Sequence, residues 1–356
     1  MTSTSKTLAT MPASAGRGSY RVAIIGAGTV KGKEVAQVIG DRNFPASDIK
    51  LLDEDEALGQ LETAGDEVTF IQNVSPEQFE RVDFTFFAAD QSSTRKHWKA
   101  ARNAGSTLID LTGELADQTD ATMRAPWVER QRGESPALQL QPGPAVIAHP
   151  AAIVLALLLL RLQRAGLSSR PVVTILEPAS ERGQKGMDEL HEQTVNLLSF
   201  QPLPKKIFDI QIAFNVVSRY GEEAKPTLAS VQERIIRDYK SISGEAPVPS
   251  VFLAQAPIFH GYAFAVHIEM QKTTGVEEVV QALTGEHIAV TSGSDEAPSN
   301  VNAAGHGDIL VSVSAEANQP GNFWLWAAAD NLRVAASNAV ECAETMAASR
   351  PQGKIQ

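Results

Sequence analysis

The first residues that could do chemistry form a glycine-rich segment that follows a short apolar run at 22–25. Gly26, Gly28 and Gly32 would let the backbone approach a pyrophosphate at the start of a helix. Thr29 and Val30 lie between the last two of these glycines. This spacing is a variant of the usual dinucleotide-binding pattern, and it is equally typical of a plain tight turn in an α/β sheet.

Asp53 ends the next predicted strand, where a carboxylate would bind a ribose 2′-hydroxyl and repel a 2′-phosphate. Glu54, Asp55 and Glu56 add three more acids directly after it. No arginine stands between Asp53 and Gly59. The segment therefore predicts NAD rather than NADP as a cofactor, and it is equally compatible with no dinucleotide at all.

Other reactive residues have simpler interpretations. Cys342, the only cysteine, falls at helical spacing among apolar residues, so burial in a helix explains it better than catalysis. Ser180 lies in a turn-like stretch without the pattern of a nucleophile elbow, so we interpret its hydroxyl as turn-forming. The seven histidines show no tight ligand spacing, so we expect no metal site.

The elements that would position these residues change character along the chain. The first part alternates short apolar strands, at 22–25, 49–52, 68–71, 82–88 and 107–111, with helices at 33–39 and 95–104. That alternation predicts a Rossmann-like parallel α/β sheet.

The second part mixes helices with longer strands. We predict helices at 151–163 and 185–198 and strands at 172–176, 262–270 and 309–313. Residues 262–270 are mostly large and apolar at even positions, which indicates a strand with one buried face. The alanine-rich segment 325–346 predicts a C-terminal helix.

Five stretches together resemble aspartate-semialdehyde dehydrogenase over roughly residues 21–346. They are the glycine-rich turn and the segments 180–190, 212–216, 256–262 and 324–340, in the order of that family. The resemblance implies a Rossmann-like dinucleotide-binding domain over 19–148 and an α+β catalytic-type and dimerisation domain over 149–323. It also implies that a helix over 324–348 packs back on the first domain. Asn338 matches an asparagine near the family's nicotinamide site.

The chain departs from the family where the chemistry takes place. Family enzymes reduce aspartyl phosphate with NADPH through a thioester on a cysteine, and that cysteine falls on Ala152, which has no nucleophilic atom. The family's acid/base histidine falls on Tyr262, whose ordinary pKa of about 10 is too high for efficient proton transfer at neutral pH. Two substrate-binding arginines fall on Gln255 and Ala116, and a glutamine falls on Glu177, so two cationic forks are lost.

These losses favour a family member without catalytic residues at the expected positions. It would act as a dimeric scaffold, a partner subunit or a nucleotide binder. The alternative is an NAD-dependent oxidoreductase of non-covalent chemistry on an amino-acid-related carbonyl, with Tyr262 or His260 as its acid/base. We expect a homodimer through 149–323, because the apolar even positions of 262–270 must be covered by a second copy or by the domain's own helices, such as 187–198. Association with an active homologue is a further hypothesis.

The composition of the chain bears on three further kinds of protein: nucleic-acid binders, membrane proteins and secreted proteins. The chain has 31 basic and 42 acidic residues and a net charge of −11, which argues against a general nucleic-acid binder. The longest apolar run, 151–160, is shorter than the about 20 residues that a membrane span needs. Residues 1–18 are rich in Ser, Thr and Ala and lack the apolar core of a secretory signal. We expect them to form a flexible tail and the protein to be cytoplasmic.

Overall fold

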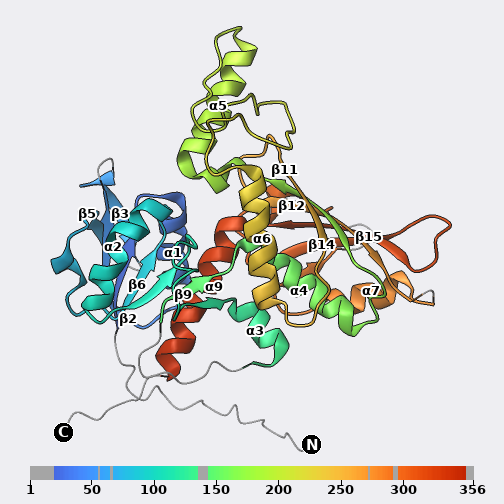
Figure 1. Cartoon of the computed structure of the whole chain (residues 1–356), viewed down its shortest axis with the longest axis horizontal. Coiled ribbons are helices and arrows are strands. Elements are labelled where there is room, and N and C mark those ends of the chain that lie inside the picture. The colour runs from blue at the N-terminus through green and yellow to red at the C-terminus, as the bar shows by residue number, and fades with distance from the viewer. Residues whose placement is uncertain are drawn as a thin grey trace, which may run out of the picture.

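The computed structural model describes residues 20–54, 57–64, 67–134, 143–271, 273–291 and 296–349. The predicted tail at 1–18, and Asp55 and Glu56 of the acidic segment, lie outside these residues. Figure 1 shows two sheets with the helix α9 (Asn331–Ser349) between them. The fold class predicted from the sequence is confirmed: a Rossmann-like parallel sheet is followed by a mixed sheet with helices.

The first sheet has seven strands in the order β5-β2-β1-β6-β7-β9-β8, with every neighbouring pair parallel. Their bounds are β1 (Tyr20–Ile25), β2 (Ala46–Asp53), β5 (Gln72–Asn73), β6 (Phe84–Phe87), β7 (Thr107–Asp110), β8 (Thr122–Arg124) and β9 (Ala145–Ile147). The helices of this part are α1 (Val30–Asp41), α2 (Gln91–Asn103) and α3 (Pro126–Arg132), with a 3₁₀ turn at Pro76–Phe79.

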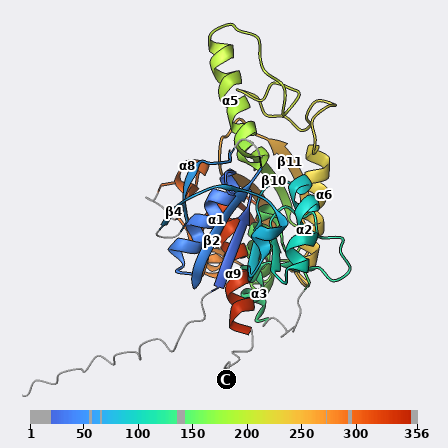
Figure 2. The same ribbon diagram turned by 90° about the vertical axis from the view of Figure 1, so that its left-hand side faces the viewer.

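Both faces of this sheet are buried, which explains why its strands are apolar runs rather than alternating segments. Val22 and Ile24 belong to one buried cluster, and Ala23 and Ile25 to the other. Helices α1 and α9 lie on the first side and α2 on the second (Figure 2). The predicted strand at 68–71 does not join this sheet. It forms β4 (Glu67–Phe70), which pairs only with β3 (Leu61–Ala64) as an antiparallel hairpin.

The second sheet has six strands in the order β11-β10-β12-β15-β14-β13. Their bounds are β10 (Val172–Glu177), β11 (Ser250–Gln255), β12 (Tyr262–Glu269), β13 (Ile288–Val290), β14 (Ile309–Ala315) and β15 (Asn322–Ala329). The helices here are α4 (Pro150–Arg164), α5 (Gly183–Leu198), α6 (Leu228–Ile242), α7 (Val276–Leu283) and α8 (Asn300–Ala303), with a 3₁₀ turn at Ala179–Arg182.

The predicted buried face of 262–270 exists, but no second copy is needed to cover it. Phe264, Val266 and Ile268 lie in one core cluster with the side chains of α4, and α6 and α7 flank that helix on the same side (Figure 1). As the alternative interpretation predicted, the domain's own helices cover this face, but the covering helix is α4 and not α5, which projects away from the sheet in both views (Figures 1 and 2).

The predicted helix over 324–348 was wrong at its start. Residues up to Ala329 form β15, which pairs antiparallel with β12 and β14. Phe323 and Leu325 face the core while Trp324 and Trp326 face outward, a period of two that the alanines after them conceal. Asp330 then accepts hydrogen bonds from the N–H groups that open α9.

Ion pairs join α9 to α1. Arg333 lies 3.0 Å from Glu34 and 2.5 Å from Asp41, while Arg42 lies 3.0 Å from Glu341. The last helix therefore lies against the first sheet's own helix. In the described part of the chain, no helix is long and apolar enough to cross a membrane.

Candidate functional site

The three glycines of the predicted motif, two in the turn between β1 and α1 and one in the first turn of α1, are each required by a contact within the protein. Gly26 has a φ of +85°, and a Cβ on it would lie 2.5 Å from the backbone nitrogen of Ala89. A Cβ on Gly32 would lie 2.0 Å from the carbonyl oxygen of Gly26. A Cβ on Gly28 would lie 2.4 Å from the Cβ of Ala57. Packing therefore explains these glycines whether or not a dinucleotide binds.

The structure brings the other predicted dinucleotide-site residues to this turn, with one exception. Thr29 caps α1 by accepting a hydrogen bond from the Gly32 N–H at 3.0 Å, and Val30 begins the helix. Asp53 ends β2, and its carboxylate accepts hydrogen bonds from the N–H groups of Gly28 at 2.7 Å and Glu54 at 2.8 Å. Each carboxylate oxygen of Asp53 thus already accepts a hydrogen bond from a backbone N–H group.

The exception is Asn338, which lies fully buried in α9. Its Oδ1 accepts a hydrogen bond from the N–H of Trp127 at 3.2 Å, and its Nδ2 donates to the carbonyl of Val334 at 2.9 Å. The amide oxygen therefore joins α9 to the start of α3, while the amide nitrogen bonds within α9.

The acidic edge beside the turn also carries basic groups from α2. Glu54 lies 2.5 Å from the Nζ of Lys96 and 2.7 Å from the Nε2 of His97. The hydrogen bond from Lys96, and then that from His97, lower the pKa of the Glu54 carboxyl. The sequence analysis did not predict Lys96 and His97 at this site. They lie in α2, 42 and 43 residues after Glu54, and only the fold brings them together.

A second group of residues surrounds the start of α4. Ala152 lies in the first helical turn with its side chain fully buried. His149 caps this helix, since its Nδ1 accepts a hydrogen bond from the N–H of Ala151 at 3.3 Å. Burial, and then the positive charges of Arg234 and Lys31, hold the pKa of His149 well below its ordinary value. The imidazole is therefore neutral.

Charged side chains from other elements meet around His149. Arg234 of α6 donates a hydrogen bond to the carbonyl of Thr112 at 2.7 Å, and Glu181 lies 3.9 Å from the Nε2 of His149. Lys31, in the first turn of α1, interacts electrostatically with Glu181, and burial lowers the pKa of its ammonium group. These residues were not predicted. The signal for α6 was present, as an apolar stripe at helical spacing: Leu228, Val231, Ile235, Tyr239 and Ile242.

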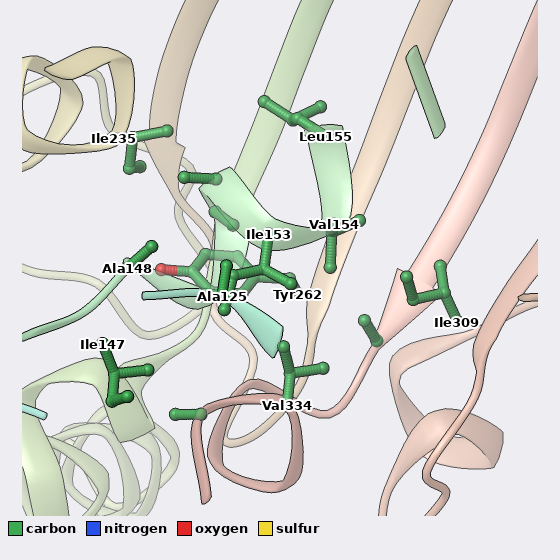
Figure 3. Close-up of a cluster of buried hydrophobic side chains, with 14 of the residues drawn as sticks. Ala125, Ile147, Ala148, Ile153, Val154, Leu155, Ile235, Tyr262, Ile309 and Val334 are labelled. Carbon is green, nitrogen blue, oxygen red and sulfur yellow. The ribbon is translucent and has the colours of Figure 1, made fainter. Parts of the chain in front are cut away.

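Tyr262 lies within the hydrophobic core rather than at an open surface (Figure 3). It is fully buried, and its hydroxyl has no hydrogen-bond partner among the residues that the structure describes. Burial, and then the negative charges of Glu181 and Glu177, raise its pKa well above the ordinary value. The phenol therefore keeps its proton throughout the neutral range.

Glu177, Gln255, Tyr220 and Arg182 form a buried polar network. The Tyr220 hydroxyl lies 3.1 Å from Glu177 and 2.7 Å from the amide oxygen of Gln255. Arg182 lies 3.6 Å from Glu177 and over the Tyr220 ring. Burial, opposed by the charge of Arg182, raises the pKa of Glu177 to about 7. The side chains at 177 and 255 therefore bind other parts of the same chain.

A further hydrogen-bonded network links Ser180, His260 and Asp330. The Nδ1 of His260 lies 3.2 Å from the Ser180 hydroxyl, and its Nε2 lies 2.9 Å from Asp330. Although burial opposes it, the pair with Asp330 raises the pKa of His260. Ser180 is buried and also donates a hydrogen bond to Asn331 at 3.2 Å, so its hydroxyl connects elements rather than facing a substrate.

Cys342 is fully buried in α9, with its sulfur 3.8 Å from that of Met346. Burial raises its pKa to about 12, so the thiol stays protonated. No group of three metal-binding side chains occurs within the described ranges.

Two family models match the chain. "Semialdehyde dehydrogenase, NAD binding domain" matches residues 21–135, and "Semialdehyde dehydrogenase, dimerisation domain" matches residues 159–334. A USG-1 protein homolog of Pseudomonas aeruginosa is 29% identical over 333 residues, covering 91% of this chain and 97% of that protein. The aspartate-semialdehyde dehydrogenase of Rickettsia bellii is 27% identical, covering 92% and 97%.

Solved structures agree with these matches. A probable aspartate-semialdehyde dehydrogenase of Pseudomonas aeruginosa superposes with a TM-score of 0.78 at 29% identity, covering 92% of this chain and 98% of that one. Aspartate semialdehyde dehydrogenase II of Vibrio cholerae, solved in complex with ASA, superposes with a TM-score of 0.79 at 26% identity, covering 93% and 98%.

Proposed function

Because the chain belongs to the semialdehyde dehydrogenase family, we propose that it keeps the family's scaffold and has lost its thioester chemistry. The observation that carries this proposal is Ala152, a buried methyl group at the position where the resemblance expects the nucleophile. Cys342 does not replace it, because that thiol is buried and protonated.

The other family positions support the same proposal. Tyr262, in place of the acid/base histidine, has a buried hydroxyl and a raised pKa, so it does not exchange protons at neutral pH. Glu177 and Gln255, in place of substrate-binding residues, are joined to each other through Tyr220.

An activity assay tests this proposal. The purified chain is mixed with aspartate semialdehyde, phosphate and NAD or NADP, and reduced nucleotide is followed. We expect no rate above the blank for the wild type or for Ala152→Cys, with Ala151→Cys as the matched control. Phosphate-dependent nucleotide reduction by the wild type contradicts the proposal.

We propose that any dinucleotide bound at the turn is NAD. Asp53 and Glu54 crowd the edge where a 2′-phosphate would lie, and Lys96 and His97 are already bonded to Glu54. Calorimetric titration decides between the cofactors. Tighter binding of NADP contradicts this assignment, and binding of neither cofactor supports a scaffold without a nucleotide.

An oxidoreductase of altered chemistry is the second candidate, and His260 is the observation in its favour. Its side chain is 25% exposed and is paired with Asp330, whereas the side chain of Tyr262 is fully buried. If this candidate holds, His260→Gln abolishes an NAD-dependent turnover of a carbonyl substrate without weakening NAD binding.

We also propose that the chain forms a homodimer through the outer face of the second sheet. Val172, Phe252, Trp324 and Trp326 share this face and are exposed. These side chains form an apolar patch in a region that matches a dimerisation domain, and burying such a patch stabilises a symmetric pair.

A further inference from the structure

A cleft of about 500 Å³ lies between α3, α4 and α7. Arg130 of α3 and Arg161 and Arg164 of α4 line it, together with His287. Leu157 and Trp127 also line it, and both are almost fully buried. Three guanidinium groups around one hollow are unexpected in a chain whose net charge is −11.

Two of these arginines form no ion pair in the part of the chain that the structure describes, although the carboxylate of Glu286, which also lines the cleft, acts electrostatically on Arg161. Arg161 is half-buried and donates hydrogen bonds only to neutral oxygens, those of the Gln131 side chain and the carbonyls of Leu283 and Glu286. Arg164 donates to the Gln131 carbonyl at 2.6 Å. Among the described residues, neither has a carboxylate within ion-pair distance.

Arg130, unlike the other two arginines, forms ion pairs, and it lines the side of the cleft that α3 contributes. It pairs with Glu341 and lies 3.2 Å from Glu286. It also donates to the Nε2 of His287 at 2.8 Å, so that imidazole is neutral. The His287 ring stacks on Trp127 at 3.9 Å with an angle of 8° between the rings. Both residues of this stack line the cleft beside the arginines.

The backbone opposite α4 fits closely around Arg161. Gly285 has a φ of +154°, and a Cβ on it would lie 3.1 Å from the Nη1 of Arg161. His287 has a φ of +64°, an uncommon conformation for a residue with a side chain. The stacked ring and the guanidinium are therefore both held by a strained loop.

We propose that this cleft binds a small anion that carries carboxylate or phosphate groups. Its carboxylate or phosphate group is held by Arg161 and Arg164, beside the His287 ring. Hydrogen bonds to backbone carbonyls explain part of the arginines' role. A guanidinium has five N–H donors, and Arg164 makes one hydrogen bond within the described ranges, so its other donors are left for a ligand.

Calorimetric titration of the full chain with citrate and, separately, with pyrophosphate tests the proposal and distinguishes the two anionic groups. Arg164→Gln should weaken binding about tenfold or more, because it removes a charge-assisted hydrogen bond, and Arg164→Glu should abolish it. Raising the salt concentration should weaken binding by the wild type.

Arg170→Gln is the matched control, because Arg170 also donates only to carbonyls, those of Val248 and Pro249, outside the cleft. It should bind like the wild type. Absence of binding by both anions overturns the proposal. So does equal binding by Arg164→Gln, which is also the result expected if pyrophosphate binds only at the glycine turn.

Discussion

Glu177 and Gln255 are register partners at the carboxyl ends of the parallel strands β10 and β11, and both are fully buried. The amide of Gln255 donates to the carbonyl oxygen of Glu177 at 2.9 Å, and Tyr220 lies within hydrogen-bond distance of both side chains. The side chains at these two positions thus hold the sheet's edge together. One oxygen of Glu177 nevertheless stays without a partner in the described structure.

The buried carboxyl of Glu177 should make stability depend on pH. Its pKa in the folded chain, about 7, lies above the ordinary 4.5, so the folded state holds a proton that the unfolded state releases. Stability should therefore fall as pH rises from about 4.5 to about 7.

Glu177→Gln should flatten this dependence, gaining on the order of 3 kcal/mol relative to the wild type across the interval. Chemical denaturation at a series of pH values measures it. Glu192→Gln, at an exposed position of α5, is the control. Parallel pH profiles for the wild type and Glu177→Gln would show that the carboxyl is not the source.

Tyr262→Phe should leave stability unchanged or raise it by about 1 kcal/mol, because it removes a buried hydroxyl that has no partner. Tyr239→Phe is the matched control, since that buried hydroxyl donates to the carbonyl of Pro247 at 2.9 Å. It should cost about 1 kcal/mol. Thermal unfolding compares the two. A loss of stability in Tyr262→Phe as large as that in Tyr239→Phe would refute the assignment.

Asp330→Asn should lower the pKa of His260, because the carboxylate at 2.9 Å favours the imidazolium. Protonated His260 stabilises the folded state at low pH through its pair with Asp330, and this contribution is lost as pH rises through the raised pKa of His260. NMR titration of the histidine resonances measures the change, with the other histidines as internal references. An unchanged value for His260 would mean that the pair does not form.

Trp324→Glu should disrupt the proposed dimer by placing a charge on the outer face of the second sheet. Light scattering should then give a mass near 38.1 kDa, against twice that for the wild type. Leu61→Glu, at an exposed position of the β3–β4 hairpin, should leave the mass of the wild type. A wild-type mass of one chain contradicts the proposal.

Local patterns in the sequence were enough to predict the first sheet's core strands and the helix α4. Val22 to Ile25 form a run that is apolar on both faces, and residues 151–160 form a helix that is buried on every side. Each segment can therefore be recognised from its own residues, without knowledge of its neighbours in the fold. The pattern was insufficient at 325–329. Alanine fits a helix by propensity, and only pairing with β12 and β14 makes this segment a strand.

By itself, the sequence determined which residue types are available at the family positions: a methyl group at Ala152, a phenol at Tyr262 and an amide at Gln255. Only the tertiary structure decided what surrounds them. Arg234 and Lys31 reach His149 from helices far apart in the chain, and Arg161 meets a loop more than a hundred residues away. Electrostatic and hydrogen-bonding contacts depend on distance in space, and no local period in a sequence records that distance.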